Sequence, residues 1–248
     1  MKGKVSKNKF LKVVLPALLV VAIICQAVGF QAVLAKGNVA TTSSDSISNL
    51  TDQQLQALTN PILQSYKADS SHKVWKMTDD SRLAVLANQT NIENARLQEV
   101  VKLVNSEFVE KEIISSPLAM VYAQEKDVSY GDILIDIDQT SSITSSSNSK
   151  EAYKITIGEN GVRLTGASEN AIMHGLRTIQ NLIITNDGLV YGEIVDYPNV
   201  AERRVHVDCA RKYISKDWFI RQIREMSYMK MNALQIHFSE NMGFRRMY

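Results

Sequence analysis

The stretch AERRVHVDCARKYISKDWFIRQIREMSYMKMNALQIHFSENMGFR, residues 201–245, decides the fold of the C-terminal part of this chain. Val205–Ala210 contains β-branched residues and predicts a strand. Ser215 is a suitable helix N-cap, and apolar residues recur behind it at helical spacing: Phe219, Ile223, Met226 and Met229. Ala233–Ser239 predicts a second strand. A strand, a helix and a strand in this order form a βαβ unit, whose crossover makes the two strands parallel.

Polar residues follow both predicted strands. Asp208 and Arg211 come at the end of the first, and Ser239, Glu240 and Asn241 at the end of the second. In barrels of alternating strands and helices the chemistry lies at the carboxyl ends of the strands. From spacing alone, the alternative is that Asp208 and Arg211 form a local salt bridge and that Glu240 is a solvated loop acid.

The order of these residues resembles a known family. The first strand is similar to the pattern R-G-x-x-x-D-x-x-R of glycoside hydrolase family 20, the β-N-acetylhexosaminidases and lacto-N-biosidases, and the matching residues are Arg203, Asp208 and Arg211. The second is similar to H-x-H-x-[ST]-D-[DN]-x-G-[WF]-R, and the matching residues are His237, Ser239, Asn241, Gly243, Phe244 and Arg245. Three residues depart from the patterns: Arg204 replaces a glycine, Gln235 the first His and Glu240 the first Asp.

The resemblance implies a (β/α)8 TIM barrel and retaining hydrolysis of β-linked N-acetylhexosaminides. In that family the 2-acetamido group of the substrate is the nucleophile, oriented by an Asp, and the neighbouring Glu is the general acid and base. This Asp-Glu pair follows the fourth barrel strand, whereas residues 1–248 reach only the second. The 248 residues are therefore expected to be an N-terminal fragment with an incomplete barrel, without catalytic residues and inactive alone. The implied partners are N-acetylhexosamine-containing glycans, and no cofactor or metal is implied.

Four residues are candidates for substrate binding on this resemblance. Arg211 matches the family arginine that grips sugar hydroxyls, a role for which its planar, always charged fork is suited. Asp208 either orients that region or has a structural role at the strand end. Glu240 stands where the family has an Asp of the active-site network. Gln235 points to the lacto-N-biosidase branch, which releases a disaccharide, and would there contact the sugar.

The N-terminus has the pattern of a secretory signal, residues 1–35. Five lysines precede an apolar run at residues 13–28, and Ala32–Ala35 is a suitable cleavage site. We expect a secreted protein that meets the membrane only through this segment, or a cell-surface protein if a C-terminal anchor exists; an uncleaved N-terminal anchor is the alternative. Without the leader the chain has 23 basic and 26 acidic residues, so its charge gives no basic footprint for nucleic acid.

The middle of the chain predicts an α+β domain. Residues 36–71 are expected to be a polar lead-in, 72–197 a non-catalytic domain of an antiparallel sheet with two helices, and 198–248 the start of the barrel. Helical faces are expected behind a capping box at Thr90–Glu93 and behind Ser168. Glu159-Asn-Gly161 predicts a hairpin turn. The remaining expectations are a solvated edge at Asp132, Asp136 and Asp138, packing or surface roles for His72 and His174, and a buried thiol at Cys209.

The family resemblance extends to the end of this domain, where its usual role is to support the barrel. The matching residues are Gly175, Leu176, Thr178, Gln180, Leu182, Ile194, Asp196 and Pro198. The α+β region itself shows no metal-ligand spacing, phosphate loop or nucleophile elbow. A second hypothesis is therefore a non-catalytic exported module that binds glycan or a cell-wall partner through this domain.

Overall fold

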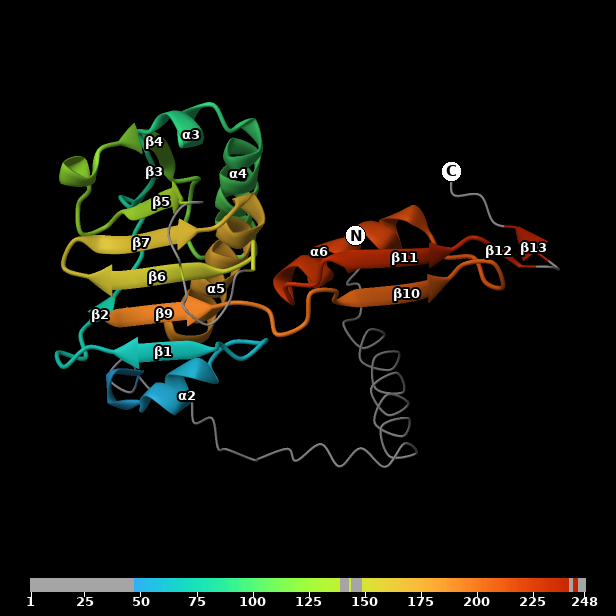
Figure 1. Cartoon of the computed structure of the whole chain (residues 1–248), viewed down its shortest axis with the longest axis horizontal. Helices are drawn as coiled ribbons and strands as arrows, with labels where there is room; N and C mark the ends of the chain where they lie inside the picture. Colours follow the sequence, from blue (N-terminus) through green and yellow to red (C-terminus); the bar gives the residue numbers. More distant parts are fainter. Residues whose placement is uncertain (1–46, 139–142, 144–148, 241–242, 245–248) are drawn as a thin grey trace, which may run out of the picture. The chain divides into compact units, whose positions relative to one another are not determined.

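The computed structural model describes residues 47–138, 143, 149–240 and 243–244. Most of them form a domain built on one seven-stranded sheet, with the strand order β1-β9-β6-β7-β5-β3-β4 (Figure 1). The strands of this sheet are β1 (Ser65–Ala68), β3 (Arg82–Leu86), β4 (Ala119–Ala123), β5 (Ile133–Ile137), β6 (Tyr153–Gly158), β7 (Gly161–Gly166) and β9 (Gly192–Asp196).

The sheet is mixed, which corrects the expectation of an antiparallel sheet. β1, β9, β6 and β7 pair antiparallel with one another in this order, whereas β5 runs parallel to both β7 and β3, and β3 runs parallel to β4. The reason lies in the connections: β3 and β4 are joined through a helix that crosses over the sheet, and such crossovers give parallel strands. The α+β class and the βαβ unit that follows it are confirmed.

Two helices, α4 (Ala95–Glu110) and α5 (Glu169–Asn186), pack against each other and against the sheet. The apolar residues predicted to face inward are all buried: Leu97, Val100, Val101, Val104, Phe108, Ile172, Leu176, Ile179 and Ile183. Ser168 caps α5 as predicted. The capping box predicted at Thr90–Glu93 is wrong, because Asn88 caps the short helix α3 (Gln89–Ile92) and Asn94 caps α4.

The sheet domain extends N-terminal to residue 72, into the predicted lead-in of residues 36–71. Its described part contains the 3-10 helix η1 (Ile47–Asn49), the helix α2 (Asp52–Gln56) and strand β1 at the edge of the sheet. The side chains of Leu55 and Tyr66 are fully buried, and the Tyr66 hydroxyl donates to the carbonyl of Val190 over 2.7 Å. This segment thus completes the core, together with the small pair β2 (Val74–Trp75) and β8 (Leu189–Val190).

The hairpin of β6 and β7 is confirmed. Gly161 has φ +90°, and a Cβ there would lie 2.6 Å from the carbonyl oxygen of Asp132. Only glycine fits such a turn without strain.

The aspartates of β5 do not form a solvated edge, because β5 lies inside the sheet. Asp132 is 2% exposed and receives two hydrogen bonds from the Arg82 guanidinium, at 2.9 and 2.6 Å. Asp136 is 7% exposed and accepts from the amide of Asn91 at 3.0 Å. Asp138 is half-buried. Paired guanidinium and amide donors make burial of these carboxylates tolerable.

A βαβ unit follows the sheet domain, and its two strands are parallel, as predicted (Figure 1). It consists of β10 (Arg204–Asp208), α6 (Lys216–Tyr228) and β11 (Ala233–His237), and Ser215 caps the helix. A small antiparallel pair, β12 (Ser239–Glu240) and β13 (Gly243–Phe244), comes after it. Cys209 is 2% exposed and packs with Val207 and Phe219, so the buried thiol is confirmed.

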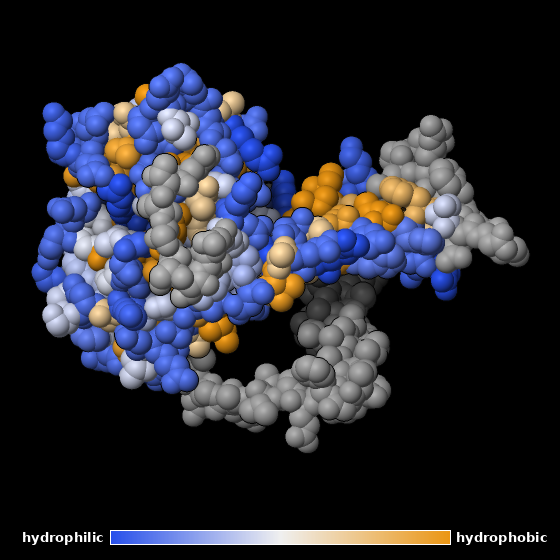
Figure 2. All heavy atoms as spheres, in the orientation of Figure 1, coloured by the Kyte–Doolittle hydropathy of each residue, from blue (hydrophilic) through white to orange (hydrophobic). Residues whose placement is uncertain are grey.

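The apolar surface of this unit is only partly covered. Phe219 and Met226 are buried, whereas Ile220 and Ile223 on the same helix are 42% and 52% exposed. Figure 2 shows hydrophobic residues gathered over the region of α6 and β11, against a mainly hydrophilic face on the sheet domain. The two strands thus cover only part of the apolar surface of α6.

Residues 1–35, for which a signal segment is predicted, lie outside the described residues. Within the described part, none of the helices combines the length and the hydropathy that crossing a bilayer requires.

Candidate functional site at the strand ends

The two parallel strands of the βαβ unit present one apolar and one polar face. Val205, Val207, Leu234 and Ile236 belong to a cluster with Phe219 of α6. The residues that alternate with them lie on the opposite face, since successive strand residues point to opposite sides: Arg204, His206, Asp208, Gln235 and His237. In a closed barrel, the face away from the helix is the interior.

Asp208 and Arg211 come together at the carboxyl end of β10. Oδ1 of Asp208 accepts from the backbone amides of Ala210 at 2.9 Å and Arg211 at 3.4 Å, and Nε of Arg211 lies 3.2 Å from Oδ2. Desolvation acts to raise the pKa of Asp208, but the two amides and the Arg211 guanidinium hold it below its ordinary value. The carboxylate stays charged and keeps the Arg211 side chain, 74% exposed, at the strand tip.

Gln235 lies farther from the strand ends than these two residues, in the middle of β11, where it pairs with His206 in the register. Its Oε1 accepts a 2.7 Å hydrogen bond from Nη1 of Arg204. The two residues are diagonal neighbours on adjacent strands, because Arg204 pairs with Ala233. The amide of Gln235 is therefore held by Arg204.

Glu240 belongs to β12 and pairs with Gly243 through the backbone; only the course of its main chain is described. The structure therefore joins Asp208 with Arg211, and Gln235 with Arg204.

Two histidines on the polar face were not among the candidate residues. His237 pairs with Asp208 in the register, and its ring lies 6.2 Å from that of His206 between centroids. Its electrostatic interaction with Asp208 acts in the direction that lowers the pKa of Asp208, after the backbone hydrogen bonds and Arg211. The alternation of polar residues along both strands is the signal that indicates them. Within the described residues no group of three or more His, Cys, Asp or Glu side chains is arranged to hold a metal ion.

The comparison with protein families matches most of this architecture. Residues 59–197 match the model described as glycosyl hydrolase family 20, domain 2, and residues 202–247 match the catalytic domain of the same family. The chain belongs to glycosyl hydrolase family 20. The two matches meet between β9 and β10, so the family's domain 2 corresponds to the sheet domain and its catalytic domain begins with the βαβ unit.

Relatives that the chain resembles in sequence include β-hexosaminidases. The chain is 31% identical over 94 residues to β-hexosaminidase B of Pseudoalteromonas piscicida, covering 38% of this chain and 12% of that protein. It is 29% identical over 99 residues to a β-hexosaminidase of Akkermansia muciniphila, covering 38% and 20%. The aligned parts are thus between about a tenth and a fifth of these relatives' lengths.

Solved structures of the family share the fold. The N-acetyl-β-hexosaminidase of Streptomyces plicatus superposes with a TM-score of 0.61 at 17% identity, over 79% of this chain and 37% of that one. The chitobiase of Flavobacterium johnsoniae gives a TM-score of 0.62 at 18% identity, over 79% and 29%. The described residues are therefore the beginning of a family 20 fold.

Proposed function

We propose that the chain is the N-terminal part of a glycosidase that hydrolyses β-linked N-acetylhexosaminides by the substrate-assisted, retaining mechanism. The observation that carries this proposal is the parallel pairing of β10 and β11, with Asp208 and Arg211 together at the carboxyl end of β10. The two sequence relatives described above, both named β-hexosaminidases, support the substrate class. N-acetylhexosamine-containing glycans are the partners on this proposal.

Arg211 is the residue of this chain that holds the sugar. Its guanidinium offers a planar set of donors to neighbouring hydroxyl groups. Asp208 orients it, because the carboxylate accepts from the backbone at the strand end and remains paired to Nε.

Residues 1–248 alone are inactive on this proposal, because the Asp-Glu pair that orients the acetamido group and transfers the proton follows the fourth barrel strand. The test is an assay of the purified 248-residue chain on a chromogenic β-N-acetylglucosaminide. No turnover is expected above the uncatalysed rate. Turnover that Arg211→Ala abolishes would show that the described residues already contain a working site.

The reading frame beyond codon 248 tests the glycosidase itself. A frame that encodes an Asp-Glu pair at the end of a barrel strand supports the proposal, and its absence favours the non-catalytic module. In the longer protein, Arg211→Ala should lower kcat/KM by about a hundredfold or more, since two hydrogen bonds from a charged group are lost. An unchanged kcat/KM would contradict the role of Arg211.

A finer proposal is that the enzyme releases the disaccharide lacto-N-biose. It depends on Gln235. With a chromogenic lacto-N-bioside and the matching N-acetylglucosaminide as substrates, Gln235→His should lower the ratio of the two kcat/KM values in favour of the monosaccharide. A ratio that already favours the monosaccharide in the unchanged protein would assign it to the β-hexosaminidases. Export of the protein through residues 1–35 is proposed on the signal pattern alone, and sequencing the N-terminus of the exported form tests it.

A further inference from the structure

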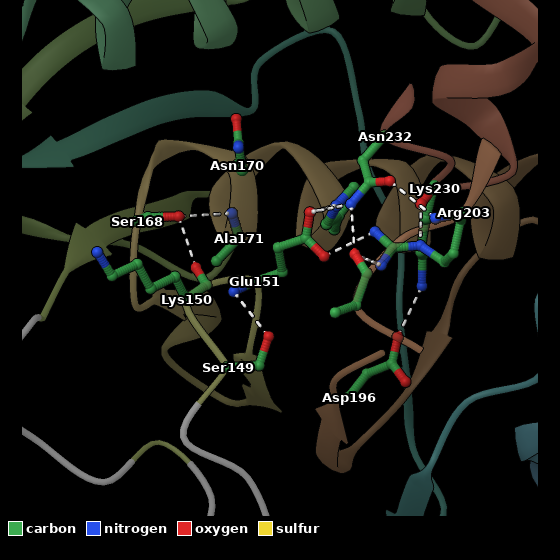
Figure 3. Close-up of polar contacts among 12 residues, drawn as sticks. Ser149, Lys150, Glu151, Ser168, Asn170, Ala171, Asp196, Arg203, Lys230 and Asn232 are labelled. Atoms are coloured by element: carbon green, nitrogen blue, oxygen red, sulfur yellow. Dashed lines mark hydrogen bonds and ion pairs between the residues drawn. The ribbon is translucent and has the colours of Figure 1, made fainter. Parts of the chain in front are cut away.

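Glu151 lies at the contact between the sheet domain and the βαβ unit, two residues before β6. Its side chain is 15% exposed, and Oε2 accepts a 2.7 Å hydrogen bond from Nη2 of Arg203. Oε1 accepts from Nδ2 of Asn232 at 3.4 Å. Figure 3 shows this carboxylate facing the two side chains. A single carboxylate of the sheet domain thus binds two residues of the βαβ unit.

The two bound residues occupy equivalent places: Arg203 immediately precedes β10, and Asn232 immediately precedes β11. They are also joined directly, since the backbone amide of Arg203 donates to Oδ1 of Asn232 at 2.9 Å. The amide of Asn232 in turn donates to the carbonyl of Arg203 at 3.1 Å. Glu151 therefore holds the starting points of both parallel strands in one hydrogen-bonded group.

We infer that Glu151 is a positioning residue for the candidate sugar site: by fixing Arg203 and Asn232, it sets where β10 and β11 begin and hence where their far ends, with Asp208 and Arg211, are placed. The functional half of this inference rests on the proposed function. The strands are five residues long, which at about 3.3 Å per residue puts Glu151 some 16 Å from the strand tips. Glu151 thus acts through the strands and does not touch the sugar.

A second contact supports the same strand starts from the other side. Nε of Arg203 donates to the carbonyl of Lys230 at 2.7 Å, and Nζ of Lys230 is 2.8 Å from Oδ2 of Asp196, at the end of β9. Arg203 is therefore held by Glu151 directly and by the carbonyl of Lys230, whose side chain is paired with Asp196. The guanidinium of Arg203 has little freedom to turn, so its contact with Glu151 fixes where β10 begins.

The neighbouring cavity does not offer Glu151 a different role. A cavity of about 250 Å³ at this contact is lined in part by Glu151, His174, Arg203 and Lys230. The nearest ring nitrogen of His174 is 3.6 Å from Oε1 of Glu151, an ion-pair distance. Both carboxylate oxygens are already engaged by Arg203 and Asn232, so the contacts of Glu151 serve the strand starts.

Amide hydrogen exchange of the 248-residue chain, followed by mass spectrometry, tests the inference without any sugar. In Glu151→Ala, peptides that cover β10 and β11 should exchange about tenfold faster, because a partly buried carboxylate and its two hydrogen bonds are lost. Peptides from β5 and β7 should exchange as before. The helix α6 stays docked through Ser227, whose hydroxyl accepts from Nε of Arg177 at 3.3 Å, so the opening should be confined to the strands.

Glu159→Ala is the matched control. It removes an exposed carboxylate of the hairpin turn, which pairs with Lys73, and it should leave β10 and β11 unchanged. Equal acceleration in β5, β7, β10 and β11 of Glu151→Ala would mean a general stabilising role and overturn the inference. No acceleration in β10 and β11 would overturn it as well.

The longer protein then tests the functional half. Glu151→Ala should raise KM for the chromogenic substrate more than it lowers kcat, with Glu159→Ala unaffected, because the positioned residues bind the sugar. Faster exchange with an unchanged KM would overturn the link to the sugar site while leaving the contact itself established. Failure of the proposed function would appear differently, as absence of hydrolysis in the unchanged longer protein.

Discussion

Arg204 and Gln235 contact each other across the first two barrel strands, with Nη1 of Arg204 2.7 Å from Oε1 of Gln235. Both residues depart from the family patterns, which have a glycine and a histidine at these places. The two departures thus meet in space although 31 residues separate them. On β10, the long side chain of Arg204 stands where the family pattern has a glycine. On β11, Gln235 supplies a side-chain oxygen that accepts a hydrogen bond from Arg204.

This relationship predicts that the two substitutions are coupled. Arg204→Gly and Gln235→His should each destabilise the chain, and the double variant should lose about 0.5–1 kcal/mol less than the sum, because both side chains are exposed and such pairs are worth little. Urea denaturation of the four proteins measures the coupling. Arg204→Gly combined with Arg211→Ala is the control and should be additive; additivity in the Arg204 and Gln235 cycle would disprove the compensation.

The core of the βαβ unit should fail before that of the sheet domain. Phe219 is 4% exposed and packs on Val207, so Phe219→Ala should cost this unit about 3 kcal/mol through lost contacts and a cavity. In a Cys25→Ser, Trp218→Phe background, fluorescence of Trp75 follows the sheet domain and thiol labelling of Cys209 follows the βαβ unit.

The expected result for Phe219→Ala is that labelling moves to lower urea while the Trp75 transition keeps its midpoint. Ile223→Ala removes a side chain that is 52% exposed on the same helix, and it should change neither transition by more than about 0.5 kcal/mol. Coincident shifts of both signals in Phe219→Ala would show instead that the two parts unfold as one.

Replacing one member of the buried pair Lys230 and Asp196 should destabilise the chain far more than replacing both. The side chains are 8% and 9% exposed, and the Tyr153 hydroxyl also donates to Asp196. Lys230→Met leaves a buried carboxylate without its cation and should cost about 3–5 kcal/mol, whereas Lys230→Met with Asp196→Asn should recover much of it. Chemical denaturation measures both. A double variant as unstable as the sum of the single variants would contradict this account.

The contact of Glu151 with Arg203 should weaken at acidic pH. The His174 ring and the Arg203 guanidinium lower the pKa of Glu151 from 4.5 to about 2, against the opposing effect of burial. Because the folded pKa lies below the ordinary value, the stabilisation is complete above pH 4.5 and is lost as the pH falls to about 2.

The stability difference between the unchanged chain and Glu151→Gln should therefore be about 1–2 kcal/mol at pH 6, a figure reduced for the partial exposure of the group, and approach zero near pH 2. Urea denaturation at both pH values measures it. Glu159→Gln should show no comparable dependence on pH, and a Glu151→Gln difference that persists at pH 2 would contradict the ionised contact.

Sequence patterns predicted those elements that are determined by residues close together in the chain. The Asn-Gly turn, the inward faces of α4 and α5 and the cap at Ser215 were all readable from neighbouring residues. The parallel direction of β10 and β11 followed from the length of the crossover between them. The mixed sheet was missed because strand direction depends on how several connections combine, and no single stretch records it.

Contacts between distant residues explain the other errors. The short strand β1, Ser-Tyr-Lys-Ala, has only four residues, of which Tyr66 is buried in the core and Ala68 packs against it, and so short a stretch shows no clear alternation. Asp132 looked like an edge residue because its partner Arg82 lies 50 residues earlier. In the candidate site, Asp208 with Arg211 was predictable since the two are three residues apart. The contact of Glu151 with Arg203 spans 52 residues and gave no sequence signal.

Lys230 has a backbone φ of +54°, in the left-handed region that ordinary side chains avoid. Glycine or asparagine would suit that backbone better, yet neither supplies the ammonium group that neutralises Asp196 inside the protein. The position is thus subject to two opposing demands, and neither can be relaxed by a change at residue 230 alone. Natural variants should therefore alter residues 196 and 230 together or leave both as they are.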